Sequence, residues 1–200
     1  MYPTLLAFAS LVAAIASVGS ETSSSGKPVD AWTTVTLPNI FYLKYRSYEN
    51  ADGLGGTGEC VSIRLVNADQ ETKTATSTIQ YWDAKKSLIK KTVHVTLAPS
   101  DGSTGGDTIQ MVDTEGVDKS TTKVQFVYSD YGTCDVVIVP GTEEKECELW
   151  VSADAVGSGD DASVKKKIAE CTGEYDKLCK NPQKHEIYDD TCSSRSKSSK

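Results

Sequence analysis

The side chains best suited to chemistry in this sequence are two acids and a tryptophan that lie next to cysteines. Asp135 follows Cys134, while Glu148 and Trp150 follow Cys147. Successive residues of a β-strand point to opposite faces, so a strand cysteine bonded to a helix outside a barrel turns its neighbours inward. Asp135, Glu148 and Trp150 would then face one interior. Carboxylates beside an aromatic ring suit an organic cation, because they offer charge-assisted hydrogen bonds and a cation–π contact.

A second interpretation of the two acids remains open at this stage. A buried carboxylate needs a partner or water, and Asp135 and Glu148 could instead be bridged by water, bonded to backbone, or turned to solvent at a strand end. Strand alternation alone supports both interpretations equally. The same alternation places Val61, Ile63 and Leu65 inside if Cys60 points outward, and it predicts one shared face for Val124, Phe126 and Tyr128.

The composition argues against several other functions. The chain has 200 residues, 21 Lys and Arg against 28 Asp and Glu, and a net charge of −7, which disfavours nucleic acid as a partner. It contains only two histidines, His94 and His185, and no Gly-x-Ser-x-Gly motif. We therefore expect no enzyme activity, no metal site and no cofactor. We expect no membrane span in the mature protein, because only the N-terminus carries a long apolar run.

The elements that must position these residues are short strands rich in Val, Ile, Thr and Tyr, separated by turn residues. We predict eight, near residues 41–48, 59–67, 72–82, 88–97, 107–112, 122–129, 134–139 and 146–152. Apolar residues then recur at helical spacing, which predicts an amphipathic helix over about 161–179. A short helical turn is expected at Asp30–Trp32. We predict an all-β fold, an eight-stranded antiparallel up-and-down barrel with the C-terminal helix packed outside and the short helix at its N-terminus.

The two ends of the chain are predicted to lie outside this barrel. Residues 1–20 resemble a signal peptide, with an apolar run from Leu5 to Ala16, so we expect a secreted, extracellular protein. Residues 21–28 read as a flexible arm, 29–192 as the barrel domain, and 193–200 as a disordered basic tail. Export exposes the six cysteines to oxidising conditions, which predicts three disulfides, and fifteen sets of pairs are possible.

The stretch from Tyr128 to Trp150 resembles the tick salivary lipocalins, specifically the histamine-binding proteins. That family carries Cys-Asp-aliphatic, then Glu-Leu-Trp, then a further cysteine; here these are Cys134-Asp135-Val136, Glu148-Leu149-Trp150 and Cys171. Residues 137–147 and 151–170 separate them, and both gaps fit the family. Asp30-Ala31-Trp32, Phe41-Tyr42 and Glu59-Cys60-Val61 match its opening helix and first two strands. The resemblance covers roughly residues 29–192.

The resemblance implies specific disulfides and ligand-binding residues. It pairs Cys60 with Cys192 and Cys134 with Cys171, which leaves Cys147 with Cys179, a pair that many members also have. Asp135, Glu148 and Trp150 match one of two amine sites within the barrel. The resemblance further implies Tyr48 and Phe41 as aromatic cavity residues and Asp52 as an acid of the second site. Alternation alone leaves the inner face of the first strand open, and a bulge there is one alternative.

This sequence departs from the family at the second amine site. The nearest counterpart of a glutamate on the fourth strand is Lys91, and an acid on the sixth strand aligns with Val124. Aromatic cavity positions correspond to Ile109, Met111 and Thr122. One of the two sites is therefore expected to be lost or rebuilt, and the cavity to be more apolar.

The function implied is that of a secreted, monomeric scavenger that binds a small host mediator in the barrel and so suppresses host inflammation. The ligand expected first is a biogenic amine, histamine or serotonin. A fatty acid or an eicosanoid such as a leukotriene is the alternative small-molecule partner. A different alternative is inhibition of a host defence protein, such as complement, through the outer surface. Inward acids and aromatics favour the scavenger, whereas outward ones favour the inhibitor.

Overall fold

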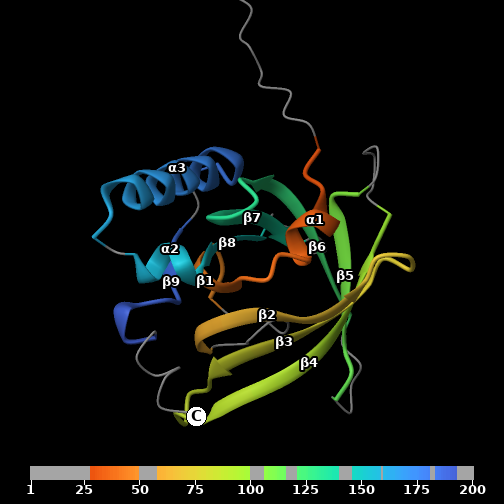
Figure 1. The fold of residues 1–200 in the computed structure, drawn as a ribbon. Helices are drawn as coiled ribbons and strands as arrows, with labels where there is room; N and C mark the ends of the chain where they lie inside the picture. The colour runs from red at the N-terminus through yellow and green to blue at the C-terminus, as the bar shows by residue number, and fades with distance from the viewer. Residues whose placement is uncertain are drawn as a thin grey trace, which may run out of the picture.

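A single antiparallel sheet closes on itself to form the body of the molecule (Figure 1). The computed structural model describes residues 28–49, 58–99, 106–115, 121–139, 146–158, 160–180 and 183–192. The expected signal peptide, the basic tail and Asp52 lie outside these residues, as does the expected arm apart from Pro28.

Eight strands run in sequence around the barrel wall, each hydrogen-bonded to the next, and β1 pairs with both β8 and β2 to complete the circle. Closure at β1 and β2 is short, because only Ser62, Ile63 and Arg64 of β2 pair with β1. The closed circle confirms the predicted barrel, and the predicted strand positions agree within a few residues. The strands are β1 (Ile40–Arg46), β2 (Glu59–Asp69), β3 (Thr74–Trp82), β4 (Leu88–Leu97), β5 (Thr108–Asp113), β6 (Thr121–Ser129), β7 (Cys134–Val139) and β8 (Glu146–Ser152).

Register shifts occur on β1, β2 and β6, and those on β1 and β6 change the direction of residues considered in the sequence analysis. On β1 the register with β8 shifts between Leu43 and Tyr45, so Arg46 rather than Tyr45 shares the inner face with Leu43. On β6 the register with β7 shifts between Phe126 and Tyr128. Tyr128 consequently packs outside against the cluster beneath the C-terminal helix. The expectation that Tyr128 shares a face with Val124 and Phe126 is therefore wrong, because the extra residue of a bulge reverses the alternation.

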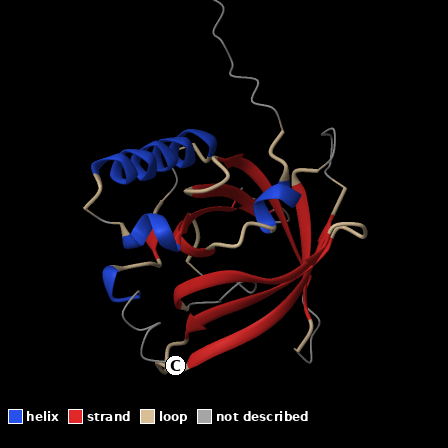
Figure 2. Cartoon of the chain, viewed as in Figure 1, coloured by secondary structure: helices blue, strands red, loops and turns tan. Residues whose placement is uncertain are grey.

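Helices cover one end and one side of the barrel (Figure 2). The short α1 (Ala31–Val35) begins at Asp30, whose carboxylate accepts a hydrogen bond from the Thr33 backbone N–H. It confirms the expected helical turn. After β8, α2 (Ala153–Gly157) leads into α3 (Ala162–Leu178), which contacts β7 and β8 from outside. None of the helices in the described parts of the chain is long and apolar enough to cross a membrane.

α1 closes one end of the barrel. The Trp32 indole N–H donates to the Gln70 side-chain oxygen at 2.7 Å, and the Ala31 backbone N–H donates to the Gly106 carbonyl at 2.8 Å. Gln70 and Gly106 belong to the β2–β3 and β4–β5 connections. These connections therefore mark the same end of the barrel as α1, and the chain direction of every other strand can be followed from them.

Three disulfides fasten the outer elements to the barrel wall. They are Cys60–Cys192, Cys134–Cys171 and Cys147–Cys179, the pairs that the resemblance implies. Cys134 on β7 and Cys147 on β8 belong to the buried cluster beneath α3, so both point outward. Closing loops of this size restricts the unfolded chain and contributes on the order of 2–4 kcal/mol each.

A ninth strand, which the sequence pattern did not indicate, fills the seam between β1 and β2. The two-residue β9 (His185–Glu186) pairs with the end of β1. Ile187, next along the chain, donates its N–H to the Lys44 carbonyl at 3.0 Å and accepts a hydrogen bond from the Cys60 N–H at 2.9 Å. Its side chain packs against the interior cluster. The C-terminal segment thus forms part of the wall itself.

Candidate ligand-binding cavity

The barrel interior contains a cavity with an empty volume of about 630 Å³, including space open to solvent. Most of its lining is apolar, and residues from α1 and the segment after it contribute to one end. The lining residues come from nearly every strand: Thr34, Val35, Leu37, Asn39, Phe41, Ile63, Leu65, Ser77, Val95, Ile109, Met111, Val124, Phe126, Asp135, Val137, Glu148 and Trp150. A largely apolar cavity with few polar groups is typical of a small-molecule site.

Asp135 is the acid at the α1 end of this cavity. It is the second residue of β7 and is paired with Ser129 on β6 and Trp150 on β8. Only 5% of the residue is exposed, and its Oδ1 has no hydrogen-bond partner among the described residues. Burial raises the pKa of this carboxyl to about 7; a hydrogen bond from Ser129 opposes the shift, and the charge of Asp130 adds to it.

Glu148 lies two residues before Trp150 on the same strand face and is 1% exposed. Its Oε1 accepts a hydrogen bond from the Tyr48 hydroxyl, and its Oε2 accepts one at 2.8 Å from the Trp150 indole N–H. Burial raises the pKa of Glu148, while the hydrogen bonds from Tyr48 and Trp150 and the positive charge of Arg46 oppose that rise. Glu148 is therefore a buried carboxylate whose two oxygens already have donors.

Arg46 is the buried cation that sequence reasoning missed. It is paired directly with Glu148 across β1 and β8, and it is 3% exposed. Its guanidinium lies over the Tyr48 ring, 5.5 Å from the centroid, and its Nη2 donates to the Glu49 carbonyl at 2.9 Å. The signal that could have located it is the bulge on β1, since simple alternation from Phe41 would place Arg46 outside.

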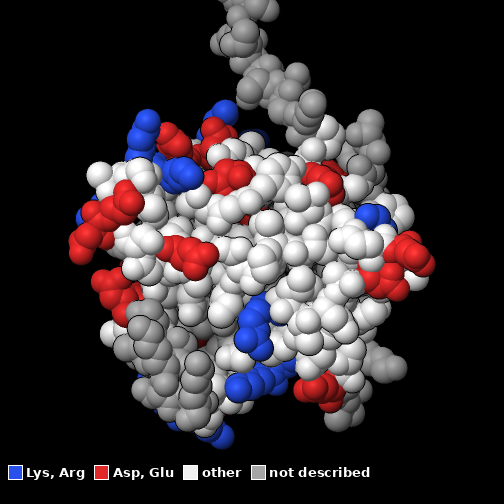
Figure 3. All heavy atoms as spheres, viewed as in Figure 1, with Lys and Arg blue, Asp and Glu red and all other residues white. Residues whose placement is uncertain are grey.

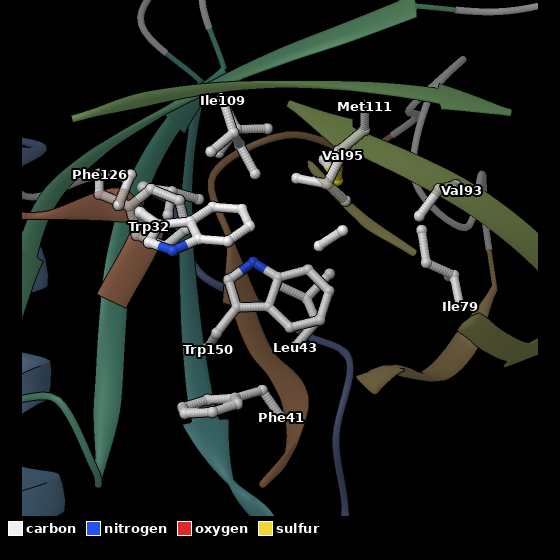
Figure 4. Close-up of a cluster of buried hydrophobic side chains, with 14 of the residues drawn as sticks. Trp32, Phe41, Leu43, Ile79, Val93, Val95, Ile109, Met111, Phe126 and Trp150 are labelled. Carbon is white, nitrogen blue, oxygen red and sulfur yellow. The ribbon is translucent and has the colours of Figure 1, made fainter. Parts of the chain in front are cut away.

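Aromatic side chains gather on one side of the interior, where Trp32, Phe41, Phe126 and Trp150 lie near one another (Figure 4). The other side is aliphatic and includes Val95, Ile109 and Met111 (Figure 4). Of these residues, Phe41, Phe126 and Trp150 line the cavity. A ring inserted between the two sides would meet an aromatic surface on one face and aliphatic side chains on the other.

The positions at which the sequence departs from the family pattern lie on the opposite wall. Ile109, Met111 and Val124 line the cavity, whereas Thr122 is not among the lining residues. Lys91 faces inward, because it is paired with the interior residue Ile79, and its Nζ lies 3.5 Å from the Asp113 carboxylate. Lys91 and Asp113 lie at the end of the barrel opposite α1, where β4 begins and β5 ends. Asp113 is an inward acid that the sequence pattern did not indicate.

The structure brings together most of the residues that the resemblance assigned to the ligand. Asp135, Glu148, Trp150 and Phe41 line one cavity. Tyr48 is not among the lining residues and contacts Glu148 instead. Asp52 lies outside the described residues. The alternation set by Cys134 and Cys147 predicted the inward direction of Asp135, Glu148 and Trp150 correctly.

The described residues include one group with suitable atoms for a metal ion, Asp130, Cys134 and Cys171. Both cysteines are joined in a disulfide, so neither offers a thiolate. The Asp130 carboxylate instead stabilises the turn before β7, where it accepts hydrogen bonds from the backbone N–H groups of Gly132, Thr133 and Cys134.

Comparison with known proteins adds to this geometry. The sequence pattern of the family described as tick histamine binding protein matches residues 20–194. A male-specific histamine-binding salivary protein from Rhipicephalus appendiculatus is 30% identical over 137 residues, which are 66% of this chain and 67% of that protein.

Solved structures of very different sequence share the fold. Insecticyanin from the tobacco hornworm Manduca sexta is 10% identical, with a TM-score of 0.61, and the match covers 83% of this chain and 86% of that one. The amine binding protein of Rhodnius prolixus, solved as a tryptamine complex, is 16% identical with a TM-score of 0.51, covering 85% and 90%. Identities this low show a common lipocalin fold and nothing further.

Proposed function

Because this chain belongs to the tick histamine-binding protein family, we propose that it is a secreted lipocalin that sequesters a biogenic amine, histamine or serotonin, in its barrel. Its action would be to lower the free concentration of a host mediator and so to suppress inflammation. Such a scavenger needs no catalysis, only tight binding. Its relative from Rhipicephalus appendiculatus is a salivary protein, and this chain has three disulfides; both support secretion.

The observation that carries this proposal is the Oδ1 atom of Asp135. It is buried in the cavity wall without a hydrogen-bond partner among the described residues. A buried, unsatisfied carboxylate oxygen is costly in the empty protein. A ligand ammonium would remove that cost and gain a charge-assisted hydrogen bond. Glu148 and Trp150 complete the proposed site, with Phe41 beside them.

The available interactions are of a suitable size for such a ligand. A charge-assisted hydrogen bond contributes about 1.5–3 kcal/mol, and a desolvated cation–π contact with Trp150 contributes about 2 kcal/mol. Nanomolar binding requires about 12 kcal/mol. The remainder must come from burying the ring of the ligand between the aromatic and aliphatic sides of the cavity.

Isothermal titration calorimetry with histamine, serotonin and a leukotriene tests the proposal. We expect saturable heat with at least one of the amines at pH 8 and none with the leukotriene. The matched variant is Asp135→Asn, which keeps the shape of the side chain and removes its charge. If neither amine binds the parent protein, or if Asp135→Asn binds amines as tightly as the parent, the proposal fails.

A fatty acid or eicosanoid is the second candidate ligand, and the apolar wall formed by Ile109, Met111 and Val124 favours it. A lipid carboxylate would need a basic group in the barrel. The inward Lys91 is a candidate, but it already lies beside Asp113, and Asp135 and Glu148 would repel a second carboxylate. Uptake of the leukotriene in place of the amines would establish this alternative.

An inhibitor acting through the outer surface would require acids and aromatics that gather outside the barrel. Asp135, Glu148 and Trp150 line the cavity instead. On the face shown in Figure 3, acidic and basic side chains are interspersed around a central uncharged area. The geometry of the described residues therefore favours the scavenger over the inhibitor.

A further inference from the structure

The two cavity carboxylates differ in what already binds them. Asp135 has a buried oxygen with no hydrogen-bond partner among the described residues. Glu148 has a donor on each oxygen, the Tyr48 hydroxyl on one and the Trp150 indole N–H on the other. A ligand ammonium would complete the hydrogen bonding of Asp135, whereas at Glu148 it would compete with donors that are already in place.

The charges around the two acids differ in the same direction. Arg46 is buried opposite Glu148, and its positive charge favours the ionised form of that carboxyl. The charged neighbour that affects Asp135 is Asp130, which is negative. Each Glu148 oxygen retains a lone pair, but the hydrogen bonds from Tyr48 and Trp150 and the positive charge of Arg46 already stabilise the negative charge of Glu148. Asp135 has no such basic neighbour among the groups that affect its pKa.

Lys91 and Asp113 form a second pair of opposite charges on the inner face, in addition to Arg46 and Glu148. Lys91 and Asp113 face the interior within 3.5 Å of each other, so their charges offset one another. Two oppositely charged pairs therefore account for four of the charged residues on the inner face in the described parts of β1, β4, β5 and β8. Glu146 shares the inner face of β8 but is only partly buried at the strand's start, so Asp135 is the buried acid on this face that the two pairs leave without an offsetting cation.

Glu148 has a different use. Its Oε2 holds the indole N–H of Trp150, and its Oε1 is fixed in turn by Tyr48, whose ring lies against Arg46. This chain of contacts fixes the direction of the Trp150 ring. A correctly directed ring face is what a cation–π contact or ring stacking requires.

We infer that Asp135 alone binds the ligand ammonium, at one amine per barrel, and that Glu148 is a positioning residue that orients the Trp150 indole. This inference rests on the proposed function. It divides between two residues a task that the family signature assigns to both. It also predicts that Glu148 affects binding only as long as residue 150 has an indole N–H to hold.

A double-mutant cycle tests the division of roles. The proteins are the parent, Glu148→Gln, Trp150→Phe and the double variant, with Asp135→Asn measured alongside. Tryptamine is the probe, and calorimetry gives the dissociation constant and the stoichiometry. Glu186→Gln on the exposed β9 removes one acidic charge outside the cavity and serves as the matched control. Circular dichroism checks that each variant is folded.

We expect a stoichiometry near one for the parent. Asp135→Asn should weaken tryptamine binding by roughly 100-fold, because a buried charge-assisted contact is lost. Glu148→Gln should cost roughly 3–10-fold in the parent and less than about twofold in the Trp150→Phe background, since the indole N–H is then absent. Glu186→Gln should leave the dissociation constant unchanged.

Two outcomes would overturn the inference while leaving the proposed function intact. One is a loss with Glu148→Gln that equals the loss with Asp135→Asn and persists in the Trp150→Phe background. The other is a stoichiometry of two. If the parent binds no amine at all, the proposed function itself fails. If Glu148→Gln does not fold, Tyr48→Phe with Trp150→Phe replaces it in the cycle, because Tyr48 acts on the indole through Glu148.

Discussion

Amine binding should weaken steeply in acid. A plot of the logarithm of the affinity against pH should change slope near the pKa of Asp135, and this change of slope is called the bend below. That pKa is about 7 in the empty protein, because burial disfavours the charged carboxylate. An ammonium bound at Oδ1 would favour the ionised form and lower the pKa. Binding below pH 7 therefore releases a proton, and affinity is complete above pH 7 and lost as the pH falls through it.

The size of the effect follows from the fraction of Asp135 that is ionised before binding. With a pKa of about 7, the carboxyl is about 90% ionised at pH 8, about 9% at pH 6 and about 1% at pH 5. The apparent dissociation constant should then rise about 10-fold at pH 6 and about 100-fold at pH 5, relative to pH 8. Primary alkylamines keep their charge throughout this range, as the lysine side chain does.

Calorimetry with tryptamine at intervals between pH 5 and pH 8 measures the bend directly. Titrations in two buffers of different ionisation enthalpy count the released protons, which should approach one at pH 6. Asp135→Asn should give weak binding that is flat with pH, and Glu148→Gln should keep the bend. A parent affinity constant within twofold from pH 8 to pH 5, or a bend that survives in Asp135→Asn, would refute the reasoning.

Three further predictions concern stability. Asp135→Asn should raise the free energy of unfolding of the empty protein by about 1–3 kcal/mol at pH 8, because the raised pKa of Asp135 means that its ionised form destabilises the fold; in urea titrations the gain should shrink as the pH falls below 7 and vanish only near the unfolded pKa of 3.8. Tyr48→Phe should lower it by about 1–3 kcal/mol in the same assay, since Glu148 loses a buried donor; an unchanged midpoint would argue against this contact. Replacing Cys60 and Cys192 with serine should cost about 2–5 kcal/mol and lower the melting temperature in calorimetry, and an unaltered melting temperature would contradict the structural importance of the seam.

Much of the fold could be predicted because its signals are local. Turn residues bounded the strands, and the change of apolar period marked α3. The direction of Asp135 and Glu148 followed from the neighbouring cysteines, because alternation along one regular strand carries a direction from one residue to the next. β7 and β8 are regular between these residues, so the reasoning held there.

The errors arose where the chain leaves that regularity. The bulges on β1 and β6 moved Arg46 inward and Tyr128 outward, and neither bulge has a glycine or proline to indicate it. β9 has only two residues, too few for a period to be visible. The hydrogen bond from Tyr48 to Glu148 joins residues 100 positions apart, so no short window of sequence indicates it. Trp150 lies two residues from Glu148 on β8, but alternation shows only that the two side chains share a face and does not show that they are hydrogen-bonded.

The seam between β1 and β2 has a consequence for how the protein is made. The segment that fills it follows α3, so during synthesis the barrel wall stays incomplete after all eight long strands have left the ribosome. Cys60 emerges first of the six cysteines and must wait 132 residues for Cys192, whereas Cys134 and Cys147 need only 37 and 32 residues to meet their partners. Until Cys192 emerges, oxidation of Cys60 can only form a wrong bond, and Cys134 is the first cysteine available for it. Any such bond must be exchanged late in folding. The yield of the folded protein should therefore follow the supply of disulfide isomerase more closely than that of a barrel whose wall is complete without its C-terminal segment.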